Sequence, residues 1–233
     1  MAFGKYIVRS VLVGAFVLAG TYGLSRIGLF DWTAHYDPLA LPDLNEKPYW
    51  LTQARLKLID AVPENCSLAL QRSGLNLANS PEKGLGSNCA LTDAVQLTHL
   101  SIARLKPEDT RCAIAARLYM WERNVVQVEA LAMFGDPVVE ITHFGSYSCR
   151  KIRGSSYMSE HATANAFDIS GFRLRSGKMI SVLKDWNVGK NSNFLHTVHD
   201  GLCDYFNLTL GPDYNADHKD HFHVDMGWVR GCH

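Results

Sequence analysis

The chain has 233 residues, 47% hydrophobic and 20% charged, a composition that excludes wholesale disorder and fits one large domain or two small ones. Its 23 basic and 23 acidic residues give a formal net charge of zero. A neutral chain offers no electrostatic reason to bind nucleic acid or another polyanion as its main partner. Neutrality does not restrict small or uncharged ligands.

The first 30 residues differ in kind from the rest. Lys5 and Arg9 precede an uncharged run of 16 residues, 10–25. That length lies between a signal-peptide core and a full membrane span, and Arg26 can snorkel to the interface and so extend the span to Phe30. We predict an uncleaved single-pass anchor in the inner membrane, with a cleaved signal peptide as the alternative. The basic residues before the run predict that the chain beyond it lies on the periplasmic side.

Residues 31–48 contain three prolines and show little periodicity, which is typical of a tether. The remaining residues, 49–233, are predicted to form the folded domain. Its expected elements are helices at 51–61, 107–134 and 193–206, strands at 95–100 and 138–142, and a loop at 71–88. Asp109 or Thr110 is the expected N-cap of the second helix. Helices and strands follow one another without regular alternation, so the predicted class is α+β.

All six cysteines follow the N-terminal segment, and none forms a CxxC pair: Cys66, Cys89, Cys112, Cys149, Cys203 and Cys232. Their wide spacing disfavours a thiolate zinc site. An even count in an exported chain predicts up to three disulfides, whose pairing the sequence leaves open. Cys66 with Cys89, which would close a short loop, is the first choice.

Two polar stretches carry candidate metal ligands. In HFHVDM, 221–226, polar and apolar residues alternate, so His221, His223 and Asp225 share one face of a predicted strand. The same alternation in AFDISGF, 166–172, puts Asp168 on a polar face. Two neighbouring strands can thus present Asp168 and His223 together, with His161 arriving from the preceding loop. Zinc binds imidazole nitrogen and carboxylate oxygen, and three protein ligands leave a position for water, so these three residues are candidate Zn²⁺ ligands.

The same stretches resemble known signatures. SEHATANAFD, 159–168, resembles the S-x-H-x-x-G-x-A-x-D signature of D-Ala-D-Ala metallopeptidases, and HFH resembles their H-x-H. Those enzymes share a zinc-binding fold with lysostaphin-type endopeptidases and the hedgehog signalling domain. The chain is more closely similar to the bacterial extensin-like C-terminal domain family, in which SYSCR, SEHA, AFDISGF, LGPDYN and DHFHVD occur in this order. The resemblance covers about Pro48 to Trp228. Ala164 stands where the metallopeptidase signature has Gly.

The resemblance implies a small antiparallel sheet with flanking helices around a zinc site, whose ligands are His161, Asp168 and His223. It implies His221 as a base or transition-state stabiliser. In the dipeptidase branch a Glu stands three residues before the last His ligand, and that position is Asp220 here. The choice between His221 and Asp220 as the base therefore stays open.

Three further roles follow from the resemblance. Arg150, which closes SYSCR, is similar to the Arg that precedes the metallopeptidase signature, and it is expected to hold a substrate carboxylate or the developing oxyanion. Arg153 is the second choice for this role. Ser159 is expected to orient the loop or a ligand, and Asp225 to bond a histidine ring nitrogen.

His196 and His199, one turn apart on the third predicted helix, are expected to face solvent.

These observations predict an exported zinc-dependent hydrolase, a peptidase of the carboxy- or endopeptidase type that acts on peptidoglycan peptides. The alternative is a non-catalytic, zinc-stabilised binding module of the cell envelope, because the hedgehog branch keeps its zinc without evident hydrolysis. A structural wall protein is disfavoured, since extensins proper are proline-rich repeats and this chain has eight prolines and no repeat.

Overall fold

The computed structural model describes residues 2–26 and 37–233. They fall into two units, the first ending at Leu41 and the second running from Pro42 to His233. Leu44, within the segment expected to be a tether, is fully buried and belongs to the core of the second unit.

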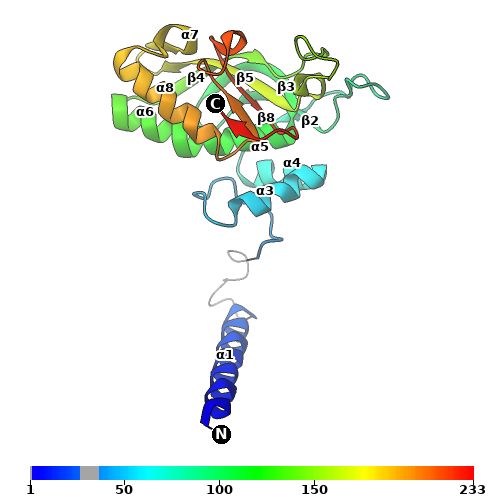
Figure 1. Cartoon of the computed structure of the whole chain (residues 1–233), viewed down its shortest axis with the longest axis vertical. Helices are drawn as coiled ribbons and strands as arrows, with labels where there is room; N and C mark the ends of the chain where they lie inside the picture. Colours follow the sequence, from blue (N-terminus) through cyan, green and yellow to red (C-terminus); the bar gives the residue numbers. More distant parts are fainter. Residues whose placement is uncertain (1, 27–36) are drawn as a thin grey trace. The chain divides into compact units, whose positions relative to one another are not determined.

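The N-terminal segment forms a helix, α1 (Ala2–Arg26) (Figure 1). The predicted membrane anchor is wrong, because the described parts of the chain contain no helix with the length and apolarity that a membrane span requires. The uncharged run of 16 residues rises only ~24 Å as a helix, against a hydrocarbon core of ~30 Å. Gly14, Gly20 and Thr21 also lower its hydropathy. The predicted extension to Phe30 and residues 31–36 of the tether lie outside the described residues.

A mostly antiparallel sheet organises the second unit. Its strand order is β1-β2-β3-β4-β5-β8-β7-β9, with β6 paired to β5, which makes nine strands within residues 37–233. Only β3–β4 and β7–β9 are parallel. The strands are β1 (Ala78–Asn79), β2 (Ala94–His99), β3 (Arg104–Arg111), β4 (Val138–Gly145), β5 (Ala166–Leu174), β6 (Met179–Ser181), β7 (Leu208–Leu210), β8 (Phe222–Asp225) and β9 (Gly231–Cys232). The α+β class is confirmed.

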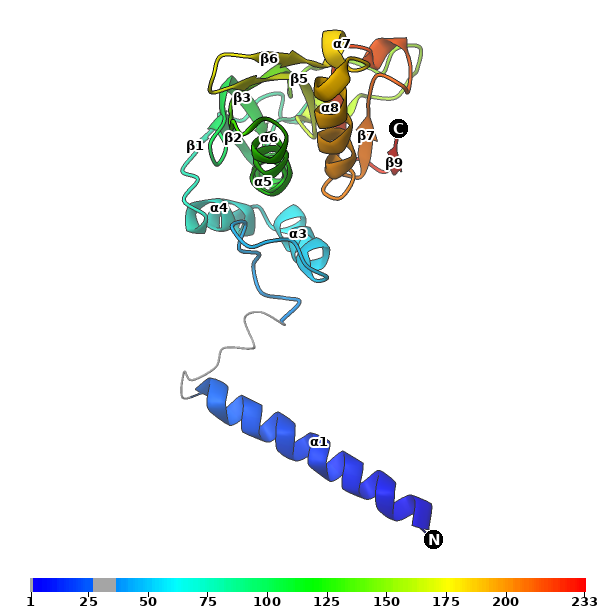
Figure 2. The ribbon, with the colours of Figure 1, turned by 90° about the vertical axis from the view of Figure 1, so that its left-hand side faces the viewer.

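Helices pack against the sheet through apolar stripes. The consecutive elements α5, η1 and α6 run on as one helical stretch, and α8 lies beside it in Figures 1 and 2. The Phe172 ring of β5 lies 6.1 Å from the Trp121 ring and 5.3 Å from the Phe194 ring, so α5 and α8 meet over the middle of the sheet. The helices are α3 (Thr52–Ala61), α4 (Pro63–Arg72), α5 (Cys112–Trp121), the π-helical η1 (Glu122–Val126), α6 (Gln127–Phe134), η2 (Glu160–Thr163), α7 (Val182–Asp185), α8 (Gly189–Leu202) and η3 (Ala216–His218).

The predicted helix 107–134 begins five residues too early. Its first residues belong to β3, which pairs antiparallel with β2 through Val95 and Thr110. Asp109 is not an N-cap, because its carboxylate accepts from the Ser80 hydroxyl and the Lys83 ammonium. The helix starts at Cys112. Strand pairing thus overrides the local cap signal.

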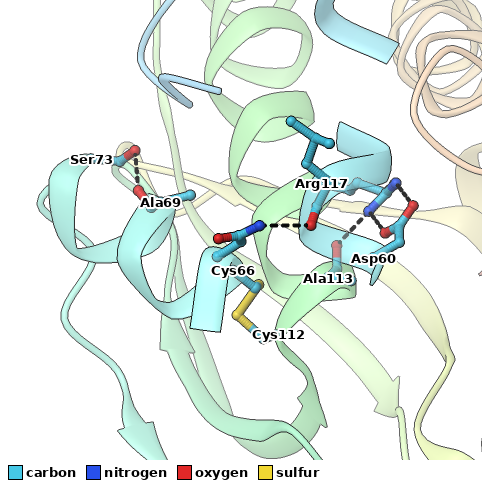
Figure 3. Close-up of a disulfide and its surroundings, with 9 residues drawn as sticks. Asp60, Cys66, Ala69, Ser73, Cys112, Ala113 and Arg117 are labelled. Carbon is cyan, nitrogen blue, oxygen red and sulfur yellow. Dashed lines mark hydrogen bonds and ion pairs between the residues drawn. A yellow bond between two sulfur atoms is a disulfide. The ribbon is translucent and has the colours of Figure 1, made fainter. Parts of the chain in front are cut away.

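The predicted pairing of Cys66 with Cys89 is wrong. The disulfides join Cys66 to Cys112, Cys89 to Cys149 and Cys203 to Cys232. Figure 3 shows the first of them, which fastens α4 to the start of α5 beside the ion pair of Arg117 and Asp60. Packing of α4 on α5 brings Cys66 and Cys112 together although 46 residues separate them. Sequence spacing alone does not show that proximity.

A buried carboxylate holds the connection between β2 and β3. Glu122, fully buried in η1, accepts hydrogen bonds from the backbone nitrogens of Ser101 at 3.1 Å, Ile102 at 3.3 Å and Ala103 at 3.1 Å. The Gln127 side-chain amide also donates to it. Burying a charge is costly unless the charged group is fully hydrogen-bonded. The three backbone donors at 101–103 lie in a turn between strands, where no neighbouring strand accepts from them, so the Glu122 carboxylate is their acceptor.

We therefore expect Glu122→Ala to destabilise the protein by about 3–5 kcal/mol, since it leaves three buried or half-buried N–H groups without an acceptor. Urea denaturation of the full chain measures the change. Glu82→Ala is the control, because Glu82 is exposed, and its effect should stay within about 0.5 kcal/mol. Equal unfolding midpoints for the two variants would contradict this account.

Candidate metal centre

Three side chains from separate elements meet on one face of the sheet. Asp168 of β5 pairs directly with His223 of β8, and His161 comes from η2. The His161 Nε2 atom lies 3.2 Å from Asp168 Oδ1 and 3.2 Å from His223 Nδ1, and His223 Nδ1 lies 2.9 Å from Asp168 Oδ1. All three side chains are at most 12% exposed. The structure thus brings together the three residues that the sequence singled out as ligands.

Local backbone features position His161. The Ser159 hydroxyl caps η2 by accepting from the His161 backbone nitrogen at 3.3 Å. Ala164 ends the turn with φ of 51°, in the left-handed region that favours glycine, and its methyl group is fully buried. A β-carbon is therefore accommodated where the metallopeptidase signature has Gly, and the turn keeps its shape.

Both histidine rings are oriented by their second nitrogen. His161 Nδ1 lies 2.8 Å from the backbone oxygen of Ser146, and a carbonyl only accepts, so this nitrogen carries the proton. The lone pair of His161 Nε2 then faces the cluster. His223 Nε2 likewise donates to the buried carboxylate of Asp225 at 3.0 Å. Outer partners of this kind fix the tautomer of metal-ligating histidines.

The centre of the cluster attracts positive charge. Burial opposes the charged form of His223, but hydrogen bonds to Asp168 and Asp225 outweigh it and raise the pKa of His223 to about 9. Burial also disfavours the charged form of Asp168, yet the neighbouring imidazoles of His161 and His223 hold the pKa of this carboxyl well below its usual range. Without a metal, one proton on His223 therefore bridges the three ligand atoms.

The residues fit zinc. Atoms bound to a tetrahedral zinc at ~2.0–2.2 Å lie about 3.3–3.6 Å from one another, a few tenths of an ångström more than the observed separations of 2.9–3.2 Å. Two imidazole nitrogens and one carboxylate are a donor set that zinc accepts, and three protein ligands leave a coordination position open. A divalent cation here would replace the shared proton and satisfy all three acceptor atoms.

His221 borders the cluster and is backed by a carboxylate. Its Nδ1 donates to Asp220 at 2.8 Å, and its Nε2 lies 3.6 Å from Asp168 Oδ1. The Phe144 ring, 61% exposed, lies edge-on to the imidazole with 5.6 Å between centroids. Asp220 therefore orients His221, and the free Nε2 of His221 is the proton acceptor nearest to the three ligand atoms.

The structure does not bring the two arginines to the cluster. Arg150 is exposed in the loop after β4, and among residues 37–233 no contact joins its side chain to the ligands. Its backbone oxygen accepts from Ser159, which places the loop beside the η2 cap. Arg153 is also exposed and pairs with Asp217.

His218, which the sequence did not distinguish from a loop residue, lies beside the cluster. Its ring centroid is 5.3 Å from that of His221 and 5.8 Å from that of His223. Burial and the two neighbouring histidines lower the pKa of His218 to about 4, so the ring is neutral at pH 7. The H-K-D-H-F-H pattern of residues 218–223 is the signal that would have found it.

The solvent-facing position expected for His199 is wrong. The ring is 5% exposed and packs against Trp186 and Phe222. His196 is half-buried, with its ring centroid 3.8 Å from that of Trp186. Both belong to the packing of α8 and take no part in the cluster.

The fold and the cluster define a mixed α+β protein with a buried His/Asp site on a mostly antiparallel sheet. Residues 64–233 match the family described as extensin-like protein C-terminus, and the chain belongs to this family. Searches of the curated proteins and of the solved structures found no match to the chain.

The pKa of His223 predicts how zinc affinity depends on pH. Because His223 is protonated below about pH 9 in the metal-free protein, a metal must displace that proton, so affinity should fall about tenfold for each pH unit below this value. Titration calorimetry near pH 7 in buffers of different ionisation enthalpy should detect release of about one proton per zinc. An affinity that does not change between about pH 6 and 8 would contradict the displacement.

Proposed function

We propose that the protein is a zinc-dependent peptidase that hydrolyses the peptide part of peptidoglycan. The observation that carries the proposal is the convergence of three ligand atoms, two of them histidine lone pairs held by outer partners, beside a third histidine that has a free nitrogen. A purely structural metal site has no need of that third histidine.

Zinc held by His161, Asp168 and His223 would act as a Lewis acid and lower the pKa of a bound water towards 7. The chain's own residues supply the proton transfers. His221 Nε2 would take the proton of the attacking water and return it to the amine that leaves when the C–N bond breaks. Asp220 accepts from the other ring nitrogen, stabilises the imidazolium that forms and keeps Nε2 aimed at the site. This division of roles makes His221 the base and Asp220 its orienting partner.

The remaining polar groups suit the binding of a peptide. His218, neutral at pH 7, donates Nδ1–H to the Asn215 side-chain oxygen, and its Nε2 is left as an acceptor for a substrate N–H. Arg150 is exposed and unpaired among the described contacts, so its guanidinium remains available for a carboxylate that approaches along the loop. The exposed rings of Phe144 and Tyr214 contact His221 and His218 respectively and offer apolar surface beside the cluster.

The choice of a peptidoglycan peptide rests on the resemblance of SEHATANAFD and HFH to the D-Ala-D-Ala metallopeptidase signature. We propose that the chain is related to those enzymes and to the hedgehog zinc fold. The pairing of Asp168 with His223 across two antiparallel strands supports this relation, because the resemblance requires the two motifs to meet.

A zinc-stabilised binding module is the second candidate. The position of Arg150 favours it, since an enzyme of the proposed type would hold substrate charge close to the metal and this side chain makes no contact with the cluster. A substrate that draws the 149–158 loop inward would bring Arg150 to the cluster, and the position of Arg150 would then no longer favour the binding module. Activity therefore decides between the two functions.

His221→Ala should keep about one zinc per chain and lose hydrolysis by a factor of about 10²–10⁴, because it removes the proton acceptor and none of the three ligands. Asp220→Asn should lose about 10-fold to 100-fold, since the ring stays but loses its orienting charge. Mass spectrometry of muropeptides incubated with each protein, with and without chelator, measures cleavage.

His161→Ala should lose both zinc and cleavage. His99→Ala is the matched control, because His99 lies on β2, which β3 and β4 separate from β5, and its ring bonds the neighbouring Thr98. If wild-type protein binds zinc and leaves every muropeptide unchanged, the peptidase proposal fails and the binding module stands.

A further inference from the structure

The backbone oxygen that fixes the His161 ring belongs to Ser146, a residue with an unusual number of bonds. Its hydroxyl bonds the backbone oxygen of Ala166 at 2.6 Å and Thr110 Oγ1 at 2.8 Å. Ser146 is 1% exposed and Thr110 is fully buried. These contacts tie the end of β4 to β3 and β5, next to the cluster, and leave Ser146 no freedom to move its carbonyl.

A carboxylate on β3 holds the same segment from the other side. Glu108 Oε1 accepts from the backbone nitrogen of Ser146 at 2.8 Å and from that of Tyr147 at 3.1 Å. The nitrogen of Tyr147 and the carbonyl of Ser146 are the two ends of one peptide group. That peptide group therefore accepts from His161 Nδ1 at 2.8 Å on one side and donates to Glu108 on the other.

The strands are shaped to admit this carboxylate. β3 and β4 are parallel neighbours with a single register pair, Arg104 and Glu140, so they are not paired where Glu108 lies. Gly145 has φ of +109°, and a β-carbon there would lie 3.2–3.3 Å from the Glu108 carboxylate. Glycine thus lets the chain turn over the carboxylate and aim two N–H groups at it.

We propose that Glu108 is a positioning residue for the metal centre, acting on His161 through the Ser146–Tyr147 peptide. The carboxylate polarises the peptide, the peptide carbonyl holds the proton on His161 Nδ1, and Nε2 is left as a lone pair facing Asp168 and His223. His223 receives the same support directly from Asp225. A carboxylate thus supports each of the two imidazoles: Asp225 bonds His223 directly, and Glu108 acts on His161 through a peptide group.

The inference rests on the proposed metal centre for its effect on zinc, but its effect on the His161 ring is measurable without metal. Glu108→Ala removes the acceptor, whereas Glu108→Gln keeps an oxygen that can accept from both N–H groups and loses only the charge. Glu140→Ala is the matched control, because Glu140 lies on the adjacent strand and pairs with Arg173 rather than with the 145–147 segment.

Two measurements on the full chain test the proposal. Nitrogen-15 NMR of the metal-free protein should show His161 as the Nδ1–H tautomer in wild type and Glu140→Ala, and a mixture of tautomers in Glu108→Ala. Competition with a chromophoric chelator should show zinc affinity reduced about 10-fold to 100-fold in Glu108→Ala, less in Glu108→Gln, and within about twofold of wild type in the control. The visible spectrum of bound Co²⁺ should differ from that of wild type most in Glu108→Ala, less in Glu108→Gln and least in the control.

Wild-type zinc affinity and an unchanged His161 tautomer in both Glu108 variants would overturn the proposal. If Glu108→Ala does not fold, Glu108→Gln alone must show the intermediate loss, and a wild-type affinity in that variant counts against the role. A wild type that binds no zinc while Glu108→Ala still alters the His161 tautomer would overturn the metal centre and leave the positioning of His161 supported.

Discussion

The antiparallel register that sets Asp168 of β5 opposite His223 of β8 is the constraint on which the rest of the candidate site depends. Side chains alternate between the two faces of a strand, so this register also buries Phe167 and Phe222 on the helix-covered face. A shift of one residue would exchange the faces, expose the aromatic rings and bury the ligands among apolar side chains. Core packing therefore holds the two ligands together as firmly as it holds the sheet.

Electrostatic repulsion among the candidate ligand atoms explains which groups surround Asp168 and His223. Three acceptor atoms within 2.9–3.2 Å of one another repel unless a cation or a shared proton lies between them. The surrounding groups favour such a positive centre, since carboxylates or carbonyls stand behind every ring: Asp225 behind His223, Asp220 behind His221 and the Ser146 carbonyl behind His161. Two contacts hold the loop that follows Ser146 beside His161. One is the disulfide of Cys89 and Cys149, and the other is the hydrogen bond that the Ser148 backbone nitrogen donates to the His161 backbone oxygen.

Much of the site was predictable because the signals are local. Strict alternation in HFHVDM predicts which side chains share a face, and the chemistry of imidazole and carboxylate predicts a metal. The failures within the folded domain share one cause, which is contact between segments distant in the chain. Pairing with β2 places residues 107–111, predicted to be helical, in a strand. α5 provides the partner of Cys66, and the packing of α8 buries His199.

The sequence by itself determined the α+β class, the ligand residues expected to meet and the even set of cysteines, because periodicity and side-chain chemistry need no partner to be recognised. Only the tertiary structure decided which residues stand behind the ligands. Glu108 lies more than 50 residues before His161 and acts through a peptide group of a third segment, so no local pattern marks it. The group that orients the His161 ring is a backbone carbonyl, which every residue type carries.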